Sequence, residues 1–192
     1  MPEKARSSLL LRGLCAVALG LHTGCQASAI KDLELPQADG AAAKPFATTN
    51  TTAVAFVFVG TECPISNRYA PEVHRLRAKF PGIRFWVVYP NVGEPDEAVQ
   101  KHAKEFGHKA PVLRDPNHKL VRLARAKVTP EAAVFSPGGE LLYHGRIDDR
   151  QVDFGKERPE ATSRDLENAL KAVLTGKAPP EPAGRAVGCP IQ

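Results

Sequence analysis

Apolar runs alternate with helix-forming stretches through the first half of the folded part of the chain. The run from Ala53 to Val59 is rich in Val and Phe, as is typical of a strand buried on both faces. Helix formers follow over 66–80, a second strand pattern covers 83–89, and a second helix pattern covers 95–106. Strands that alternate with helices predict a parallel sheet joined by right-handed crossovers.

The second half changes to a pattern of adjacent strands. A short apolar piece precedes Asn117, which we expect to cap a helix over 118–126. The apolar runs 132–136 and 141–145 flank a Pro-Gly-Gly turn and therefore predict an antiparallel hairpin. A last amphipathic helix is predicted over 162–175. The order βαβα followed by ββα predicts an α/β fold, a three-layer sandwich with a mixed central sheet.

The last helix is expected to bury one apolar face and to stop at Gly176. The chain beyond it, 177–192, begins with several prolines and has no periodic pattern. This composition is typical of an extended, flexible arm, and the arm carries Cys189. The apolar face of the helix consists of Leu166, Ala169, Leu170, Val173 and Leu174.

The amino-terminal residues have the pattern of an export signal. Lys4, Arg6 and Arg12 supply positive charge, and the apolar stretch Leu9 to Leu21 is too short to span a bilayer comfortably. The segment that ends at Cys25 resembles a bacterial lipoprotein cleavage box, in which this cysteine becomes lipidated. His22 departs from the usual aliphatic residue of that box, so simple secretion remains an alternative to lipidation.

The predicted organisation is one folded domain between two tails. An export signal covers 1–25, a tether and leading segment cover 26–50, the folded domain covers 51–176, and the arm covers 177–192. The location that follows is the periplasm or cell envelope, with the membrane as a partner through a lipid anchor. A length of 192 residues with 43% hydrophobic content is enough for one core.

Charge and composition exclude several kinds of partner. The net charge is +5, of which the predicted signal accounts for +2, so the mature protein retains +3. One tryptophan and three tyrosines do not make an aromatic platform, so nucleic acid is not a predicted partner. The histidines form neither a helical pair nor a cluster with cysteine, so no metal and no other cofactor is predicted.

Two cysteines remain once the predicted signal is removed, Cys63 and Cys189. Cys63 lies between a predicted strand and a predicted helix, where free backbone N–H groups and the helix dipole favour a thiolate. Cys63 is therefore the candidate nucleophile. An exported protein with two cysteines tends to pair them, either transiently or permanently.

Five short segments are similar, in order and spacing, to the thioredoxin-like superfamily and in particular to its redoxin branch. They are LELP at 33–36, CPIS at 63–66, VTP at 128–130, FSPGGE at 135–140 and YHGRID at 143–148. The similarity spans roughly residues 32 to 176. It implies the thioredoxin fold, with thiols and disulfides of proteins or small molecules as substrates.

The resemblance also implies roles for individual residues. Cys63 falls where thioredoxins carry a two-cysteine motif, and Thr129 with Pro130 matches their substrate-binding cis-proline loop. Ser66 replaces the second cysteine of that motif, so it is expected to stabilise the thiolate but not to resolve a mixed disulfide. Peroxiredoxins would need threonine at Gly60, so the match to a peroxidase is partial.

A second copy of part of the motif lies near the carboxyl end. The segment Gly188-Cys189-Pro190-Ile191 echoes residues 63–65 and makes Cys189 the candidate resolving cysteine. The sequence thus predicts an exported thiol–disulfide oxidoreductase with Cys63, Ser66 and Cys189 as catalytic residues. Three alternatives stay open: a thiol peroxidase, a non-catalytic module with a structural disulfide, and a copper-binding module of the same fold.

Overall fold

The computed structural model describes residues 30–192. The predicted export signal, together with the predicted lipidation site Cys25, lies outside the described residues. Among the helices of the described part, none combines the length and the hydropathy that crossing a bilayer requires.

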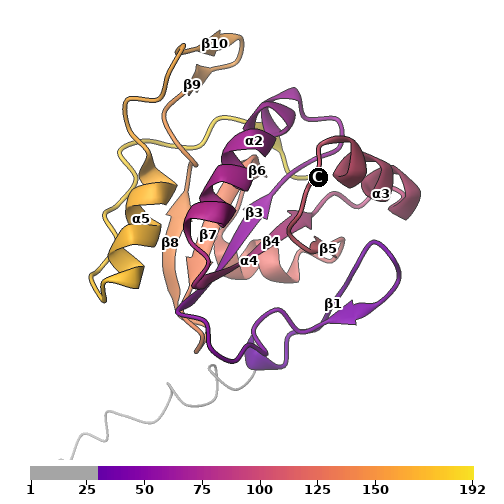
Figure 1. Cartoon of the computed structure of the whole chain (residues 1–192). Helices are drawn as coiled ribbons and strands as arrows, with labels where there is room; N and C mark the ends of the chain where they lie inside the picture. Colours follow the sequence, from indigo (N-terminus) through magenta and orange to yellow (C-terminus); the bar gives the residue numbers. More distant parts are fainter. Residues whose placement is uncertain (1–29) are drawn as a thin grey trace, which may run out of the picture.

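A five-stranded mixed sheet forms the centre of the molecule, in the order β5-β4-β3-β7-β8 (Figure 1). The first three of these strands run parallel, and β7 and β8 are antiparallel to their neighbours. Every residue of β3 is buried, as the continuous apolar run predicts. The bounds are β3 Ala53–Phe58, β4 Ile83–Tyr89, β5 Val112–Arg114, β7 Glu131–Phe135 and β8 Leu141–Gly145.

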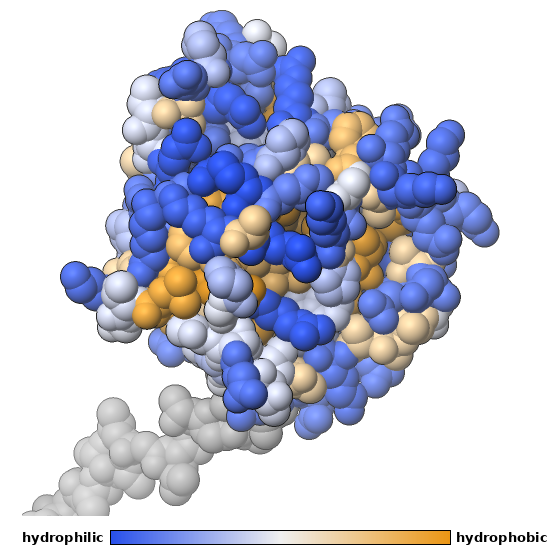
Figure 2. Space-filling model, viewed as in Figure 1, coloured by the Kyte–Doolittle hydropathy of each residue, from blue (hydrophilic) through white to orange (hydrophobic). Residues whose placement is uncertain are grey.

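Helices cover both faces of the sheet. Buried residues of α2 and α5 belong to one hydrophobic cluster, and those of α4 belong to the cluster on the other face. Figure 1 shows α2 and α5 in front of the strands and α4 behind them. The face shown in Figure 2 is mainly hydrophilic, and apolar residues appear on it as patches between the hydrophilic ones. The bounds are α2 Pro64–Lys79, α3 Asp96–Glu105, α4 Lys119–Ala124 and α5 Asp165–Leu174.

Two local predictions about helices are wrong. Helix α4 begins at Lys119 because the buried carboxylate of Asp115, not Asn117, accepts its first N–H groups, at 2.8 Å from Lys119 N. In α5 the predicted apolar face is buried except for Leu174, whose exposed fraction is 40%. Leu174 is the last residue of the helix.

The leading segment packs on the domain. Strands β1 (Leu35–Pro36) and β2 (Ala42–Ala43) form a small antiparallel hairpin, and Gln37 bridges to the end strand β5. Phe46 is 2% exposed and contacts Phe56 and Phe135 with ring centroids 5.3 Å apart in each case. This segment therefore closes the hydrophobic cluster that contains α4.

Two short pairs of strands were not predicted. Strands β9 (Gln151–Asp153) and β10 (Lys156–Glu157) form a hairpin before α5. Strand β6 (Val128–Thr129) pairs antiparallel with β11 (Cys189–Pro190), the end of the arm. The arm was expected to be flexible, but its last residues are held by this pairing.

The docked end of the arm has apolar anchors on both sides of the sheet. Val187 and Cys189 pack against the cluster under α2 and α5. Ile191 packs against the opposite cluster, which contains α4. The same short segment thus contacts both cores of the domain.

Candidate functional site

Cys63 is the N-cap residue of α2, at the carboxyl end of the central strand β3. Its own N–H donates to Gly60 O at 3.2 Å, and its carbonyl accepts the first helical N–H, that of Asn67, at 3.1 Å. The helix begins at Pro64, which suits the first helical position because proline has no N–H to leave unpaired. Cys63 therefore lies at the helix N-terminus, as its position in the sequence predicts.

The sulfur of Cys63 is buried against the loop that carries the cis proline. The peptide bond between Thr129 and Pro130 is cis, as the resemblance implies. In its protonated form the Cys63 thiol donates a hydrogen bond to Thr129 O, with Sγ and O 2.9 Å apart. Cys63 is only 2% exposed and Thr129 only 1%. The structure therefore brings Cys63 together with Thr129 and Pro130. Cys63 and Thr129 are 66 positions apart in the sequence.

Strand β11 places the second cysteine in the same site. Cys189 is paired in register with Thr129, the residue whose carbonyl contacts Cys63. Gly188 passes so close to the loop that a Cβ there would lie 2.2 Å from Thr129 O. Only glycine permits this approach. Both cysteines are free thiols in the structure, with Cys63 buried and Cys189 partly exposed.

Further hydrogen bonds hold the end of the arm across the site. Ile191 N donates to Lys127 O at 3.1 Å, on the β6 side. Gln192 N donates to Asn91 Oδ1 at 3.1 Å, and Gln192 O accepts from Val92 N at 3.3 Å. The arm therefore spans from the cis-proline loop to the loop that follows β4 (Figure 1).

Ser66 occupies the position of the missing second cysteine and is 2% exposed. Its hydroxyl accepts a hydrogen bond from Gly60 N at 3.4 Å. Both its hydroxyl and its backbone N–H favour the anionic form of Cys63. Ser66 thus lies beside Cys63, where its hydrogen bonds lower the pKa of that thiol.

The two sulfurs have opposite electrostatic environments. Burial raises the pKa of Cys63, but hydrogen bonds from the Cys189 thiol and from Ser66 outweigh it, so the pKa of Cys63 is lowered overall. Burial and the neighbouring Cys63 sulfur raise the pKa of Cys189 to about 12. Of the two thiols, Cys63 is therefore the one that ionises first, while the proton stays on Cys189.

Sequence reasoning missed Glu94, which holds the loop before Cys63. Its Oε1 accepts from Thr61 N at 2.8 Å, from Thr61 Oγ1 at 2.9 Å and from Asn91 Nδ2 at 3.2 Å. Asn91 also binds the end of the arm, so one polar group connects the Cys63 loop to β11. The contact joins loops 33 positions apart, and no local pattern marks it.

Three other charged residues are not among the groups that contact Cys63. Glu62 is exposed. Arg68 pairs with Glu157 at 2.9 Å and Arg146 with Asp165 at 2.6 Å, so both guanidinium groups have carboxylate partners away from Cys63. The described residues contain no group of three or more His, Cys, Asp or Glu side chains arranged to hold a metal ion.

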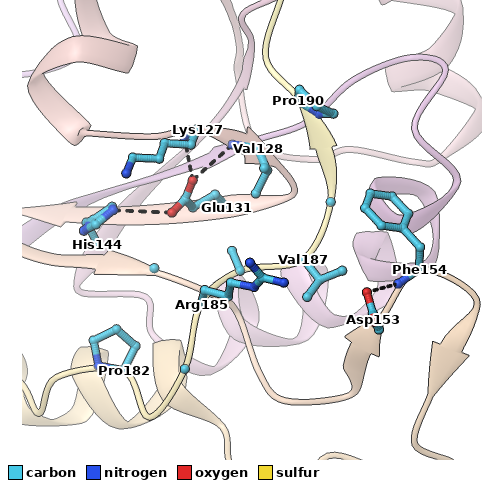
Figure 3. A pocket seen from close by; sticks show the side chains of 14 residues that line it. Lys127, Val128, Glu131, His144, Asp153, Phe154, Pro182, Arg185, Val187 and Pro190 are labelled. Atoms are coloured by element: carbon cyan, nitrogen blue, oxygen red, sulfur yellow. Dashed lines mark hydrogen bonds and ion pairs between the residues drawn. The ribbon is translucent and has the colours of Figure 1, made fainter.

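A pocket of about 560 Å³ lies between the arm and the β6–β8 edge of the sheet. Figure 3 shows Glu131 on one side and the arm residues Arg185 and Val187 on the other. The buried Glu131 carboxylate accepts from Lys127 N at 2.7 Å, which fixes the chain just before Thr129. Residues on both sides of Cys189 line the pocket but Cys189 does not, so the pocket lies on the face of β11 that points away from the sulfurs.

Solved structures share this architecture. An uncharacterised conserved protein from Geobacillus kaustophilus superposes with a TM-score of 0.70 at 23% identity, covering 83% of this chain and 87% of that one. A thioredoxin-like protein from Aeropyrum pernix has a TM-score of 0.57 at 14% identity, with 79% and 92% covered. The chain has the thioredoxin fold. The fold class predicted from the sequence is therefore confirmed.

A further structure with this thioredoxin fold is a secreted disulfide oxidoreductase from Mycobacterium tuberculosis. Its TM-score is 0.55 at 16% identity, and the match covers 76% of this chain and 98% of that one. No family model matches the chain, and no curated protein sequence matches it. The comparisons thus identify the fold.

Proposed function

We propose that the protein is a thiol–disulfide oxidoreductase of the redoxin branch that works through Cys63 and Cys189. The observation that carries this proposal is geometric: β11 pairs Cys189 in register with Thr129, whose carbonyl oxygen lies 2.9 Å from Cys63 Sγ. The pKa of Cys63 is lowered and that of Cys189 is raised, in agreement with it. Two titratable groups whose environments separate their pKa values are typical of a catalytic pair. A purely structural pair of cysteines has no need of a stabilised thiolate.

The proposed reaction transfers two electrons from the protein to a disulfide. The Cys63 thiolate attacks one sulfur of the substrate, forms a mixed disulfide and releases the other sulfur as a thiolate. Cys189 then loses its proton to solvent and attacks Cys63 Sγ. This closes a Cys63–Cys189 disulfide and releases the second substrate sulfur as a thiolate. The substrate is reduced to two thiols and the protein pair is oxidised.

We propose that the substrate binds at the cis-proline loop. Thr129 presents backbone groups beside Cys63, but β11 pairs with this edge in the described state. An extended substrate therefore takes the place of β11 at β6 while Cys63 reacts. Strand addition at an exposed edge recognises the backbone of a partner, so protein disulfides in extended segments are the substrates that fit best.

The pH dependence of alkylation tests the thiolate of Cys63. In the reduced protein, iodoacetamide should label Cys63 with a midpoint below the pH that is usual for a thiol, because the pKa of Cys63 is lowered. Mass spectrometry of each cysteine across pH measures the midpoint. Cys189→Ala removes a donor to the thiolate and should move the midpoint upward. A Cys63 midpoint at or above the usual value would contradict the proposal.

We further propose that the protein acts outside the cytoplasm, anchored through Cys25. The amino-terminal sequence pattern supports this, and one protein of the same fold is secreted. In a bacterial host that processes lipoproteins, the full chain should fractionate with membranes, and Cys25→Ser should move it to the soluble exported fraction. Cys15→Ser is the matched control and should leave the distribution unchanged. Equal distributions for all three chains would exclude lipidation.

A further inference from the structure

We propose that a thiol that reduces the oxidised protein attacks Cys189, so that Cys189 carries the mixed disulfide and Cys63 leaves as the thiolate. The inference rests on the proposed function, because it starts from the Cys63–Cys189 disulfide. In this proposal each of the two half-reactions, reduction of the substrate and reduction of the protein, takes place at a different sulfur. Cys63 meets the substrate when the protein is reduced, and Cys189 meets the reducing partner when the protein is oxidised.

Access to the two sulfurs supports this division. Cys63 is 2% exposed, with Thr129 O 2.9 Å from its sulfur. Cys189 is partly exposed, on the outer strand of the β6–β11 pair. In the reduced protein the arm is held only by non-covalent contacts and can leave Cys63 open. In the oxidised protein the disulfide itself keeps β11 over Cys63, so Cys63 stays covered.

The direction of attack gives the same result. A thiolate attacks a disulfide sulfur in line with the bond that breaks, from the side opposite the leaving sulfur. Attack on Cys63 would have to come from the side away from Cys189, through the packed junction of β3 and α2, where Ser66 is also 2% exposed. Attack on Cys189 comes from the side away from Cys63, and Cys189 is the less buried of the two residues.

The chemistry balances with a dithiol as the reducing partner. Its first thiolate forms a bond to Cys189 Sγ as the Cys63–Cys189 bond breaks and the electron pair stays on Cys63. Its second thiolate attacks the partner's own sulfur in the mixed disulfide and releases Cys189, which takes up a proton. The partner becomes a disulfide and the protein pair regains two electrons. Cys189 has no S–H to donate in the mixed disulfide, but Ser66 still donates to Cys63, and a thiolate that accepts a hydrogen bond is the better leaving group.

Mapping a trapped intermediate tests the proposal, with reduced glutathione as the probe. The mature protein is oxidised to the disulfide form, exposed briefly to glutathione at neutral pH, quenched with acid and alkylated. Peptide mass spectrometry should find glutathione on Cys189 at least about tenfold more often than on Cys63, with the alkyl label on Cys63. Glutathione mainly on Cys63 would overturn the proposal. If no internal disulfide forms at all, it is the proposed function that fails.

A kinetic readout tests the identity of the leaving sulfur independently. Ser66→Ala removes a donor to Cys63 and should slow the reaction of glutathione with the disulfide, by about threefold for each unit by which the pKa of Cys63 rises. Ser136→Ala, in the hairpin turn remote from the site, is the control and should have no effect. If Ser66→Ala raises the pKa of Cys63 without slowing glutathione, Cys63 is not the leaving sulfur.

Discussion

Replacing Cys63 with serine is expected to reduce disulfide-reducing activity by at least about a thousandfold, to the background rate, because a serine hydroxyl is not an anion at neutral pH. Serine is close to cysteine in size, so the buried junction of β3 and α2 should remain folded. Turbidity from insulin reduction measures the activity, and consumption of hydrogen peroxide is followed in parallel. We expect insulin reduction without peroxide turnover for the unmodified protein.

The matched variant for this experiment is Cys189→Ser. It keeps the nucleophile and should still form a mixed disulfide on Cys63, which then accumulates because no second sulfur releases it. Circular dichroism verifies that both variants are folded. Insulin reduction that survives in Cys63→Ser would refute the assignment of the nucleophile, and peroxide consumption that depends on Cys63 would favour the peroxidase instead.

The second large effect is expected from Gly188→Ala. An added Cβ would lie 2.2 Å from Thr129 O, a backbone atom that cannot turn aside, so β11 has to leave β6. Cys189 is then no longer aligned with Cys63. The equilibrium constant for closing the internal disulfide, measured against glutathione buffers, should fall by at least about tenfold, because alignment accounts for much of the effective concentration of two linked groups.

Gly93→Ala provides the control for that substitution. It makes the same chemical change in the loop that binds Gln192, but no atom lies within 4 Å of the new Cβ. Its disulfide equilibrium should match that of the unmodified protein. Hydrogen exchange of the arm should rise in Gly188→Ala alone. An unchanged disulfide equilibrium in Gly188→Ala would show that pairing with β6 does not position Cys189.

Local patterns predict most of this fold. The continuous apolar run at β3 requires cover on both faces, and the amphipathic stretch of α5 requires a partner on one face, which together specify a layered sheet. The position of Cys63 at a helix N-terminus also follows from its immediate neighbours. Asn117 shows the limit of such patterns, because the competing carboxylate of Asp115 is also in the loop and is the group that binds the helix.

The rest of the candidate site depends on contacts that no local pattern contains. Strand β11 is only two residues long. It is held by pairing with β6, where Cys189 lies opposite Thr129, 60 positions earlier in the chain. A strand so short has no detectable period, and Gly188 gives no sign in the sequence of the carbonyl that it passes. The role of Glu94 is equally hidden from local patterns. A glutamate is typical of a protein surface, and this one holds the Cys63 loop only because the fold brings Thr61 beside it.

The anchors of the arm on both sides of the sheet have a consequence for how this protein varies. Val187 rests on one hydrophobic cluster and Ile191 on the other. A repacked side chain in either cluster therefore changes how firmly the segment between them is seated. In a protein with both sulfurs on one helix, such core substitutions would leave the redox activity unchanged. Here we expect them to change that activity. Mutations in the two cores should consequently show non-additive effects on redox chemistry, although the cores lie on opposite faces of the sheet.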